Sequence, residues 1–328
     1  MRILVTGGAG FIGSNFIRYW LSNHQNDSIV NFDALTYAGN PENLRDIENH
    51  PGYKFVHGNI CDSEALKKSM EDVDTVVHFA AESHVDRSIA DSDVFIKTNV
   101  LGTHKLLEEI RCRGDQIKRF HHISTDEVFG ALPLSTPDRF HENTLYKPRS
   151  PYSASKAASD HLCRAYFHTH DLPVTISNCS NNYGPYMFPE KFIPVVILNA
   201  LEDKPIPIYG DGLYVRDWIH VMDHCRGIEA ILERGRIGET YCLGGEYEPS
   251  NLEVVKTVLE ILNKPLSLIT HVQDRQGHDR RYSIDDSKAR RELEWRPQIS
   301  FRQGLIEMID WYKDNESWWR PLMAKSKF

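Results

Sequence analysis

The sequence has little of what marks a membrane, secreted or nucleic-acid-binding protein. No segment approaches the roughly 18 apolar residues of a transmembrane helix, and the N-terminal apolar segment meets Gly7 too early for the core of a signal peptide. The six cysteines include no C-x-x-C pair, which predicts no metal site, no disulfide framework and free thiols in a reducing cytoplasm. The 38 basic and 46 acidic residues include no basic run, so neither nucleic acid nor a membrane is an expected partner.

The chain is long enough to bury a large core. It has 328 residues, 41% of them hydrophobic, with 20 glycines and 16 prolines and no low-complexity segment or repeat. A chain of this size can bury about three quarters of the surface that its extended form exposes. We therefore expect a globular protein with more than one domain, not a disordered one.

The first half of the sequence alternates short apolar segments with segments of helical period. Strands are predicted at 2–6, 29–32, 54–57, 75–79, 119–123 and 174–177, and helices at about 12–24, 62–70, 94–113 and 152–170. Several strands are apolar on both faces, as in a parallel sheet that helices cover on two sides. The alternation predicts an α/β fold, with a doubly wound parallel Rossmann sheet in residues 1–178.

The second half has a different texture, because prolines divide it into short pieces. Helical patterns return near 223–234, 250–262, 286–293 and 301–314. We expect a smaller, loop-rich substrate domain over 179–328, with the chain returning to the first domain around 215–245.

A glycine-rich turn directly follows the first predicted strand and opens the first helix. Gly7 and Gly10 permit a tight turn that brings backbone N–H groups to a pyrophosphate, and Gly13 lets the helix pack closely on the strand. Asp33 ends the second strand, where a carboxylate can bind ribose hydroxyls but repels a 2′-phosphate. The pattern predicts NAD as cofactor, although a glycine-rich turn alone also occurs without a ligand.

Two polar motifs accompany the fifth strand and the helix after it. Tyr152 and Lys156 share one helix face, so the ammonium can lower the pKa of the phenol and make it a base near neutrality. Thr125, Asp126 and Glu127 follow the fifth strand, whose carboxyl end faces the ligand crevice. Each motif alone is also typical of a solvated surface. Adjacent carboxyls beside a tyrosine base, however, indicate a second reaction with one acid and one base.

Together these motifs resemble the extended short-chain dehydrogenase/reductase family, and within it the nucleotide-sugar 4,6-dehydratases. The resemblance runs nearly end to end, through residues 35–40, 80–89, 178–185, 216–218 and 277–282. The Asp126–Glu127 pair is its discriminating feature, since epimerases of the family lack the pair.

The resemblance implies a reaction in three steps. Tyr152, positioned and tuned by Thr125 and Lys156, removes the proton of the sugar 4-OH while C4 gives a hydride to NAD. Glu127 then takes the C5 proton as Asp126 protonates the departing 6-OH. The hydride finally returns to C6, so NAD is regenerated in each turnover and is expected to stay tightly bound.

The resemblance also implies which residues bind the cofactor and the substrate. For NAD they are Gly7, Gly10, Phe11, Ile12, Gly13, Asp33, Thr36, Asn59, Ile60, Ala81, Asn99, Tyr152 and Lys156. For a nucleoside-diphosphate sugar they are Ser83, His84, Thr125, Asn181, Lys191, Arg216, Arg275 and His278. A homodimer formed by the helices near 94–113 and 152–170 is a further implication.

Three residues depart from what is usual in the family, namely Asn59, Phe129 and Gln276. The last two are expected near the substrate, so the sequence leaves open whether dTDP-glucose or a UDP-sugar (UDP-glucose or UDP-N-acetylglucosamine) is bound. A non-catalytic NAD-binding scaffold is a more distant alternative, because a fold does not fix a function. The acid–base residues argue against it, since a scaffold has no use for them.

Overall fold

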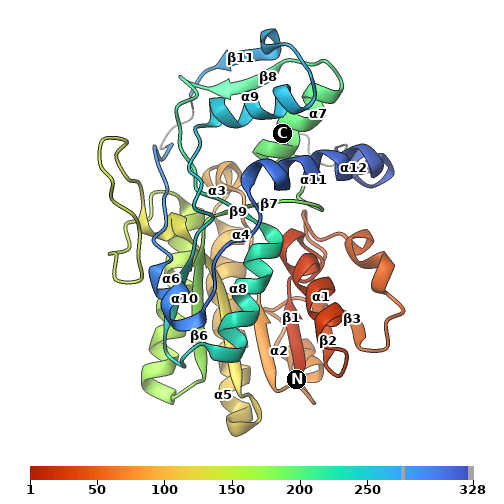
Figure 1. Cartoon of the computed structure of the whole chain (residues 1–328). Coiled ribbons are helices and arrows are strands. Elements are labelled where there is room, and N and C mark those ends of the chain that lie inside the picture. Colours follow the sequence, from red (N-terminus) through yellow and green to blue (C-terminus); the bar gives the residue numbers. More distant parts are fainter. Residues whose placement is uncertain (275–277, 324–328) are drawn as a thin grey trace.

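The structure of the protein, a computed structural model, describes residues 1–274 and 278–323. A seven-stranded sheet forms the lower half of the molecule in Figure 1, and all of its neighbouring strands are parallel. In spatial order the strands are β10 (Thr240–Leu243), β6 (Val174–Cys179), β5 (Arg119–Thr125), β4 (Thr75–His78), β1 (Arg2–Thr6), β2 (Ser28–Asp33) and β3 (Tyr53–His57). The predicted doubly wound α/β fold is confirmed.

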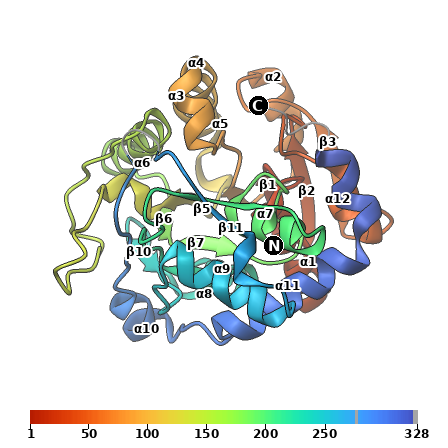
Figure 2. The same cartoon turned by 90° about the horizontal axis from the view of Figure 1, so that it is seen from above.

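Helices cover both faces of this sheet, as the view from above shows (Figure 2). On one face lie α1 (Phe11–Asn23) and α8 (Val221–Arg234), and on the other α2 (Ser63–Ser69), α5 (Thr103–Arg113) and α6 (Pro151–His170). Side chains of a strand point alternately to the two faces. Accordingly, Ile3 and Val5 of β1 belong to the core on the α1 side, and Leu4 to the core on the α5 side.

The chain between β4 and β5 departs from the single helix predicted at 94–113. It forms α3 (Val85–Ala90), α4 (Asp93–Phe95) and a π-helical segment, η2 (Ile96–Gly102), before α5 begins. Such wide turns inside helices are frequent at functional sites. Here Thr98 of η2 lines the main cavity of the protein.

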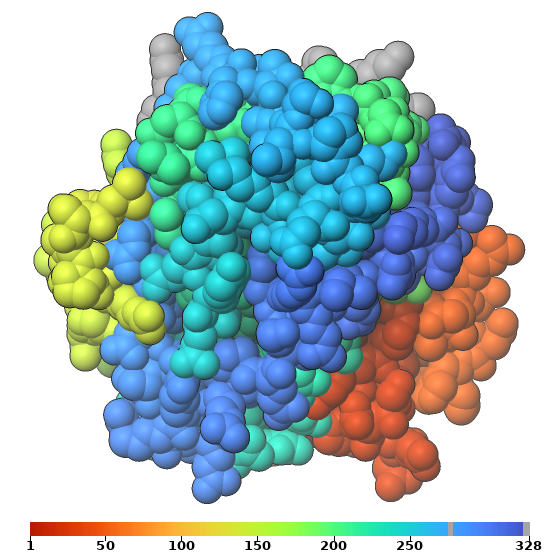
Figure 3. Space-filling view, turned by 45° about the horizontal axis from the view of Figure 1, so that its top comes forward, coloured from red at the N-terminus to blue at the C-terminus, as the bar shows by residue number. Residues whose placement is uncertain are grey.

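A second group of elements forms the upper part of Figure 1 around a core of its own. It contains α7 (Phe192–Leu201), β8 (Ile206–Tyr209), α9 (Asn251–Ile261), β11 (Ile269–Val272), α11 (Phe301–Asp314) and α12 (Glu316–Met323). Between the two groups, β7 (Asn181–Tyr183) pairs with β9 (Trp218–His220). The space-filling view shows the later segments, in green, cyan and blue, lying over the top of the molecule (Figure 3).

The remaining helices are short or peripheral. They are α10 (Ser287–Leu293) and the helical turns η1 (Pro41–Ile47), η3 (Gly114–Gln116), η4 (Asp126–Phe129) and η5 (Leu266–Leu268). Among the described residues, every helix is too short or too polar to cross a lipid bilayer.

The predicted strands and helices are present, with ends that differ by a few residues. Several short elements were not predicted, among them β10 of the main sheet and α7 of the second core. The seventh strand, β10, was not predicted because its four residues show no pattern of their own. Helix α7 was not predicted because prolines were taken to break this region, although Pro194 lies in the first helical turn, where its missing N–H costs nothing.

Candidate active site

A cavity of about 330 Å³ opens at the carboxyl ends of the central strands. It lies where the strand order reverses between β1 and β4, the usual ligand position in such sheets. A second cavity of about 100 Å³ adjoins it, and both are lined by Glu127 and Asn181. The two cavities therefore meet at one of the predicted catalytic residues.

The glycine-rich turn forms one wall of the larger cavity. Gly7 has a φ of +73°, and a Cβ added there would lie 2.6 Å from the backbone nitrogen of Ala80. A Cβ on Gly13 would lie 2.5 Å from the carbonyl oxygen of Gly7. Because the residue before α1 is Gly10, no side chain of its own competes for the first N–H groups of the helix. The turn thus has the form of a pyrophosphate cradle that side chains would fill.

Asp33 stands at the end of β2 beside this cradle. One carboxylate oxygen accepts the N–H of Ala9 (2.9 Å) and the other accepts the N–H of Leu35 (2.8 Å). Burial raises the pKa of Asp33, while these two hydrogen bonds oppose the rise. Each oxygen keeps a lone pair for a hydroxyl group, so the carboxylate can still bind a ribose.

All but one of the residues predicted to bind NAD line the larger cavity. They are Gly7, Gly10, Phe11, Ile12, Gly13, Asp33, Thr36, Asn59, Ile60, Ala81, Tyr152 and Lys156. Asn99 does not line it. Its amide binds the backbone N–H and carbonyl of Glu82 (2.9 and 3.0 Å) and the hydroxyl of Ser155 (2.8 Å). In this structure Asn99 therefore supports the cavity wall at Glu82 and does not itself line the cavity.

The acidic pair lies at the start of η4, directly after Thr125. The Thr125 hydroxyl donates to Asp126 (3.2 Å) and accepts the N–H of Glu127 (3.3 Å). Asp126 is buried, and burial raises its pKa well above the ordinary value, with the negative charges of Glu127 and Asp217 adding to the rise. This environment favours the protonated form of Asp126.

Tyr152 lies in the first turn of α6, where Pro151 takes the first position and Ser150 caps the helix. The predicted lowering of its pKa is wrong for this structure. Burial raises the pKa of Tyr152 well above its usual value, the charge of Glu127 adds to the rise, and the Thr125 hydroxyl opposes it. The ammonium of Lys156 donates to the carbonyl of Ile123 (2.7 Å).

The predicted substrate residues divide between the two cavities. Ser83, Thr125, Asn181 and Lys191 line the larger one, while Asn181, Arg216 and His278 line the smaller one. Arg216 is buried and lies 4.2 Å over the ring of Tyr282. The ring of His278 stacks on Tyr214, with 3.6 Å between centroids.

Among the described residues, one predicted substrate residue, His84, lines neither cavity. His84 caps α3 by accepting the N–H of Arg87 (3.4 Å), and it lies 3.6 Å from Glu190. Arg275 lies outside the described residues, as does the unusual Gln276. The other departures have local explanations. Phe129 packs in the core 5.2 Å from Phe140, away from the cavity walls, and the side chain of Asn59 accepts the N–H of Cys61 (2.8 Å).

Several cavity residues were not predicted. The larger cavity is also lined by Tyr37, Glu82, Met187 and Phe188, and the smaller one by Val85, Ile89, Arg149, Asp279 and Tyr282. Glu82 and Tyr282 fall in segments that carried the family resemblance, which is the signal that could have found them. Met187 and Phe188 follow β7 in a stretch that has no pattern.

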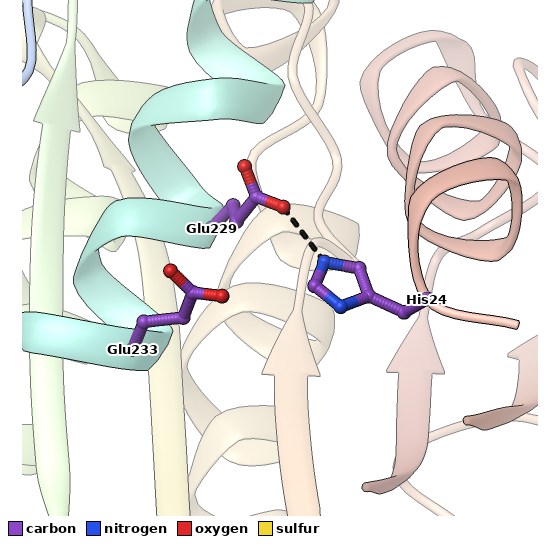
Figure 4. Close-up of side chains that lie close together, drawn as sticks. All are labelled: His24, Glu229 and Glu233. Carbon is purple, nitrogen blue, oxygen red and sulfur yellow. Dashed lines mark hydrogen bonds and ion pairs between the residues drawn. The ribbon is translucent and has the colours of Figure 1, made fainter. Parts of the chain in front are cut away.

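One further cluster of polar side chains lies away from the cavities, between α1 and α8 (Figure 4). A ring nitrogen of His24 and one carboxylate oxygen each of Glu229 and Glu233 all lie within 4.8 Å of one another. His24 and Glu229 already bind each other at 2.7 Å, and the hydroxyl of Tyr19 also donates to Glu229. The cluster accounts for part of the contact between the two helices.

The fold and the site together define a class of protein. A Rossmann sheet with a dinucleotide-type cradle, a tyrosine and lysine on α6 and an acid–base pair after β5 is the arrangement of a short-chain dehydrogenase/reductase that acts on nucleotide sugars. Residues 4–308 match the family described as GDP-mannose 4,6 dehydratase, and the chain belongs to that family.

Within this family the chain is similar, over nearly its whole length, to dTDP-glucose 4,6-dehydratases. That of Neisseria meningitidis serogroup B is 50% identical, over 99% of this chain and 97% of the relative. The crystal structure of the Bacillus anthracis enzyme in complex with NAD has 49% identity and a TM-score of 0.92, over 98% and 99% of the chains. The Streptomyces venezuelae enzyme with NAD and TYD bound has 48% identity and a TM-score of 0.94, over 98% and 100%. The resemblance seen in the sequence is confirmed.

Proposed function

We propose that this protein is an NAD-dependent hydro-lyase that converts dTDP-glucose to dTDP-4-keto-6-deoxyglucose. The observation that supports this most is the position of Glu127, where the cofactor-type cavity meets the smaller one beside Arg216. Asp126 and Tyr152 lie close enough to act on each other's protonation. Relatives about half identical to this chain carry the dehydratase name over nearly the same length.

The cavity residues fit NAD as the cofactor. The glycine-rich turn and the start of α1 would hold the pyrophosphate, and Asp33 a ribose. When bound, NAD accepts a hydride from C4 of the sugar and later returns it to C6.

Tyr152 acts first, by taking the proton of the sugar 4-OH. Because burial raises the pKa of its phenol, the phenolate needs positive charge and hydrogen-bond donors around it. Thr125 supplies a hydroxyl, and Lys156 supplies a buried ammonium on the same face of α6. Oxidation at C4 then acidifies the proton on C5.

Asp126 and Glu127 carry out the elimination. Because burial favours its protonated form, Asp126 can give a proton to the departing 6-OH, while Glu127 can take the proton from C5. Each such proton-transfer group contributes about 10²- to 10⁴-fold in rate. The environment of the buried carboxyl thus assigns it the role of acid.

The smaller cavity would hold the nucleoside diphosphate. Arg216 lies there with Arg149 and His278, and Lys191 stands in the larger cavity, where its ammonium donates to the carbonyl of Ser83 (3.2 Å). An arginine gives a diphosphate two parallel hydrogen bonds.

The two hydrophobic cores support a division of the chain into two binding units. We propose an NAD-binding unit formed by residues 1–178 together with a return of the chain around 215–245, and a nucleotide-sugar unit formed by the rest of 179–328. In support, β10 pairs with β6 and α8 packs in the core of α1, whereas α7, α9 and α11 share a separate core.

We further propose that the protein works as a homodimer in the cytoplasm. Four large apolar side chains between α3 and η2 are exposed, namely Ile89, Val94, Ile96 and Leu101. A second copy would cover them. All six cysteines are free thiols, which suits a reducing compartment. Sedimentation of the purified protein as a monomer would contradict the dimer.

Three candidate substrates test the proposed function. We would incubate the purified protein with dTDP-glucose, UDP-glucose or UDP-N-acetylglucosamine without adding NAD, and follow each by mass spectrometry. Conversion of dTDP-glucose to a product lighter by one water is the expected result. Conversion of a UDP-sugar alone would correct the nucleotide, and conversion of none of them by protein that retains NAD would contradict the dehydratase. The Tyr152→Phe variant is the matched inactive control.

A further inference from the structure

A third buried ionisable residue continues the catalytic face of α6. Tyr152, Lys156 and Asp160 follow one another at intervals of four residues, so all three lie on one side of the helix. Lys156 and Asp160 are buried, at 4% and 0% exposure. Asp160 lines neither cavity, so it does not reach a substrate or cofactor.

His122 of β5 lies between Lys156 and Asp160. Its Nε2 atom lies 3.4 Å from the ammonium of Lys156 and 3.2 Å from a carboxylate oxygen of Asp160. The imidazole is fully buried, and burial lowers its pKa to about 4, so it is neutral at working pH. A neutral imidazole nitrogen can accept from the ammonium or donate to the carboxylate, but not both at once, so His122 separates the two charges without adding one of its own.

The other oxygen of Asp160 is held by hydroxyl groups. It accepts hydrogen bonds from Ser124 of β5 (2.8 Å) and from Tyr146 (2.7 Å). The Tyr146 hydroxyl in turn accepts a hydrogen bond from Arg164 (2.7 Å). Burial alone would raise the pKa of Asp160, but His122, Lys156 and the hydrogen bond from Tyr146 lower it and so favour the ionised form.

The charge of Lys156 needs such a partner, because an isolated buried ammonium is costly. Burial lowers the pKa of Lys156, and the charge of Asp160 opposes that lowering. Further titratable or charged groups act on Lys156, His122 or Asp160. They are His78 of β4, His121 of β5, Tyr146 of the following loop, Cys163 and Arg164 of α6, and Cys179 of β6. Among these described groups, Asp160 is the only carboxylate.

We propose that Asp160, which lies behind His122, is the positioning residue whose charge keeps Lys156 protonated and in place beside Tyr152. The inference rests on the proposed function, in which the phenolate of Tyr152 needs the ammonium of Lys156. Asp160 touches no reacting atom. Its effect reaches the chemistry only through the charge of the lysine.

The Asp160→Asn variant tests this inference, because it removes the charge and keeps the size of the side chain. Lys156 then loses its proton at lower pH, and without that ammonium Tyr152 ionises at higher pH. A nearby opposite charge typically moves the pKa of a group by about 1 to 3. In the variant, the pH range in which enzyme-bound NADH forms should therefore end at lower pH, with the alkaline limit moved by about one unit or more.

Two measurements separate this effect from a loss of stability. The rate of NADH formation in a single turnover with dTDP-glucose is measured across pH, and thermal unfolding is measured on the same samples. The ionisation of Tyr152 is followed without turnover by the absorbance of tyrosinate. For each protein, the absorbance of its Tyr152→Phe derivative is subtracted, so that only Tyr152 contributes to the difference. The ionisation should move to higher pH in Asp160→Asn.

The control variant is Asp223→Asn, which removes another fully buried carboxylate. Asp223 lies on α8 and accepts hydrogen bonds from the backbone N–H groups of Gln298 and Ile299 (2.8 and 2.9 Å). Its loss should therefore lower stability and leave the pH profile unchanged. The His122→Asn variant should narrow the profile in the same direction as Asp160→Asn, and it serves if the latter does not fold.

An Asp160→Asn or His122→Asn profile that superimposes on that of the wild type would overturn the inference, even if the variant is less stable. Failure of the wild-type protein to convert dTDP-glucose would instead contradict the proposed function. In that case the tyrosinate titration still decides whether Asp160 controls the lysine.

Discussion

The double variant Asp126→Asn, Glu127→Gln should separate the first hydride transfer from the elimination. Both substitutions keep the size of the side chain and remove the ability to exchange a proton. The oxidation of C4 depends on Tyr152, which the variant retains. Substrate should therefore be oxidised, and NADH should remain on the enzyme because no water leaves.

The structure gives the size and direction of two effects. Loss of the acid and of the base should each slow elimination by about 10²- to 10⁴-fold. The oxidation of C4 should instead become easier at low pH, because the charge of Glu127 is the largest charge effect that raises the pKa of Tyr152. Without that charge Tyr152 ionises at lower pH, so C4 oxidation should begin at lower pH than in the wild type.

Stopped-flow absorbance of NADH after addition of dTDP-glucose measures both effects. Asp126→Asn alone is the matched control, since it keeps the charge of Glu127, which is the larger of the two carboxylate effects on the pKa of Tyr152. The absence of bound NADH in the double variant, at any pH, would refute the assignment of roles. So would elimination at the wild-type rate.

Three further predictions concern the cofactor, the substrate and stability. Gly13→Ala should yield protein without NAD, seen by absorbance after denaturation, because its Cβ would lie 2.5 Å from the carbonyl of Gly7; retained NAD would contradict the cradle. Arg216→Lys should weaken the binding of dTDP by about tenfold to a hundredfold in calorimetry, since a charged hydrogen bond is lost, and an unchanged Kd would place the diphosphate elsewhere. Burial lowers the pKa of His224 to about 3, so the unfolded state binds the extra proton as pH falls below about 6.5 and stability is lost there. Between about pH 6 and 4, the free energy of unfolding of His224→Gln in urea should fall by about 1.4 kcal/mol less per pH unit than that of the wild type. Parallel curves for the two proteins would refute this.

Local patterns made much of the fold predictable. The strands and helices of the first half were predicted because they are long enough to show a period, and the cradle because Gly7, Gly10 and Gly13 stand at a strand–helix junction. β10 was missed because four residues show no period and its place in the sheet depends on pairing with β6. The break of the predicted helix at η2 also follows from contacts distant in sequence, such as that of Asn99 with Glu82.

Most of the predicted site residues line the cavities, but the electrostatics of the site were less predictable. The spacing of Tyr152 and Lys156 correctly places them on one helix face, but the sequence does not show how deeply the phenol is buried. Burial therefore reversed the predicted direction of its pKa shift. His84 was predicted at the substrate because its neighbours match the family, yet its ring caps α3. Arg149 and Tyr282 meet Arg216 only in the folded chain.

The central claim is that one hydride leaves C4 and returns to C6 of the same sugar within the closed site. It is tested most directly with dTDP-glucose that carries deuterium at C4, followed by mass spectrometry and NMR of the product. The account predicts that the deuterium appears in the C6 methyl group of a 4-keto product. A product whose deuterium has been lost to solvent, or a C6 methyl group without it, would contradict the account.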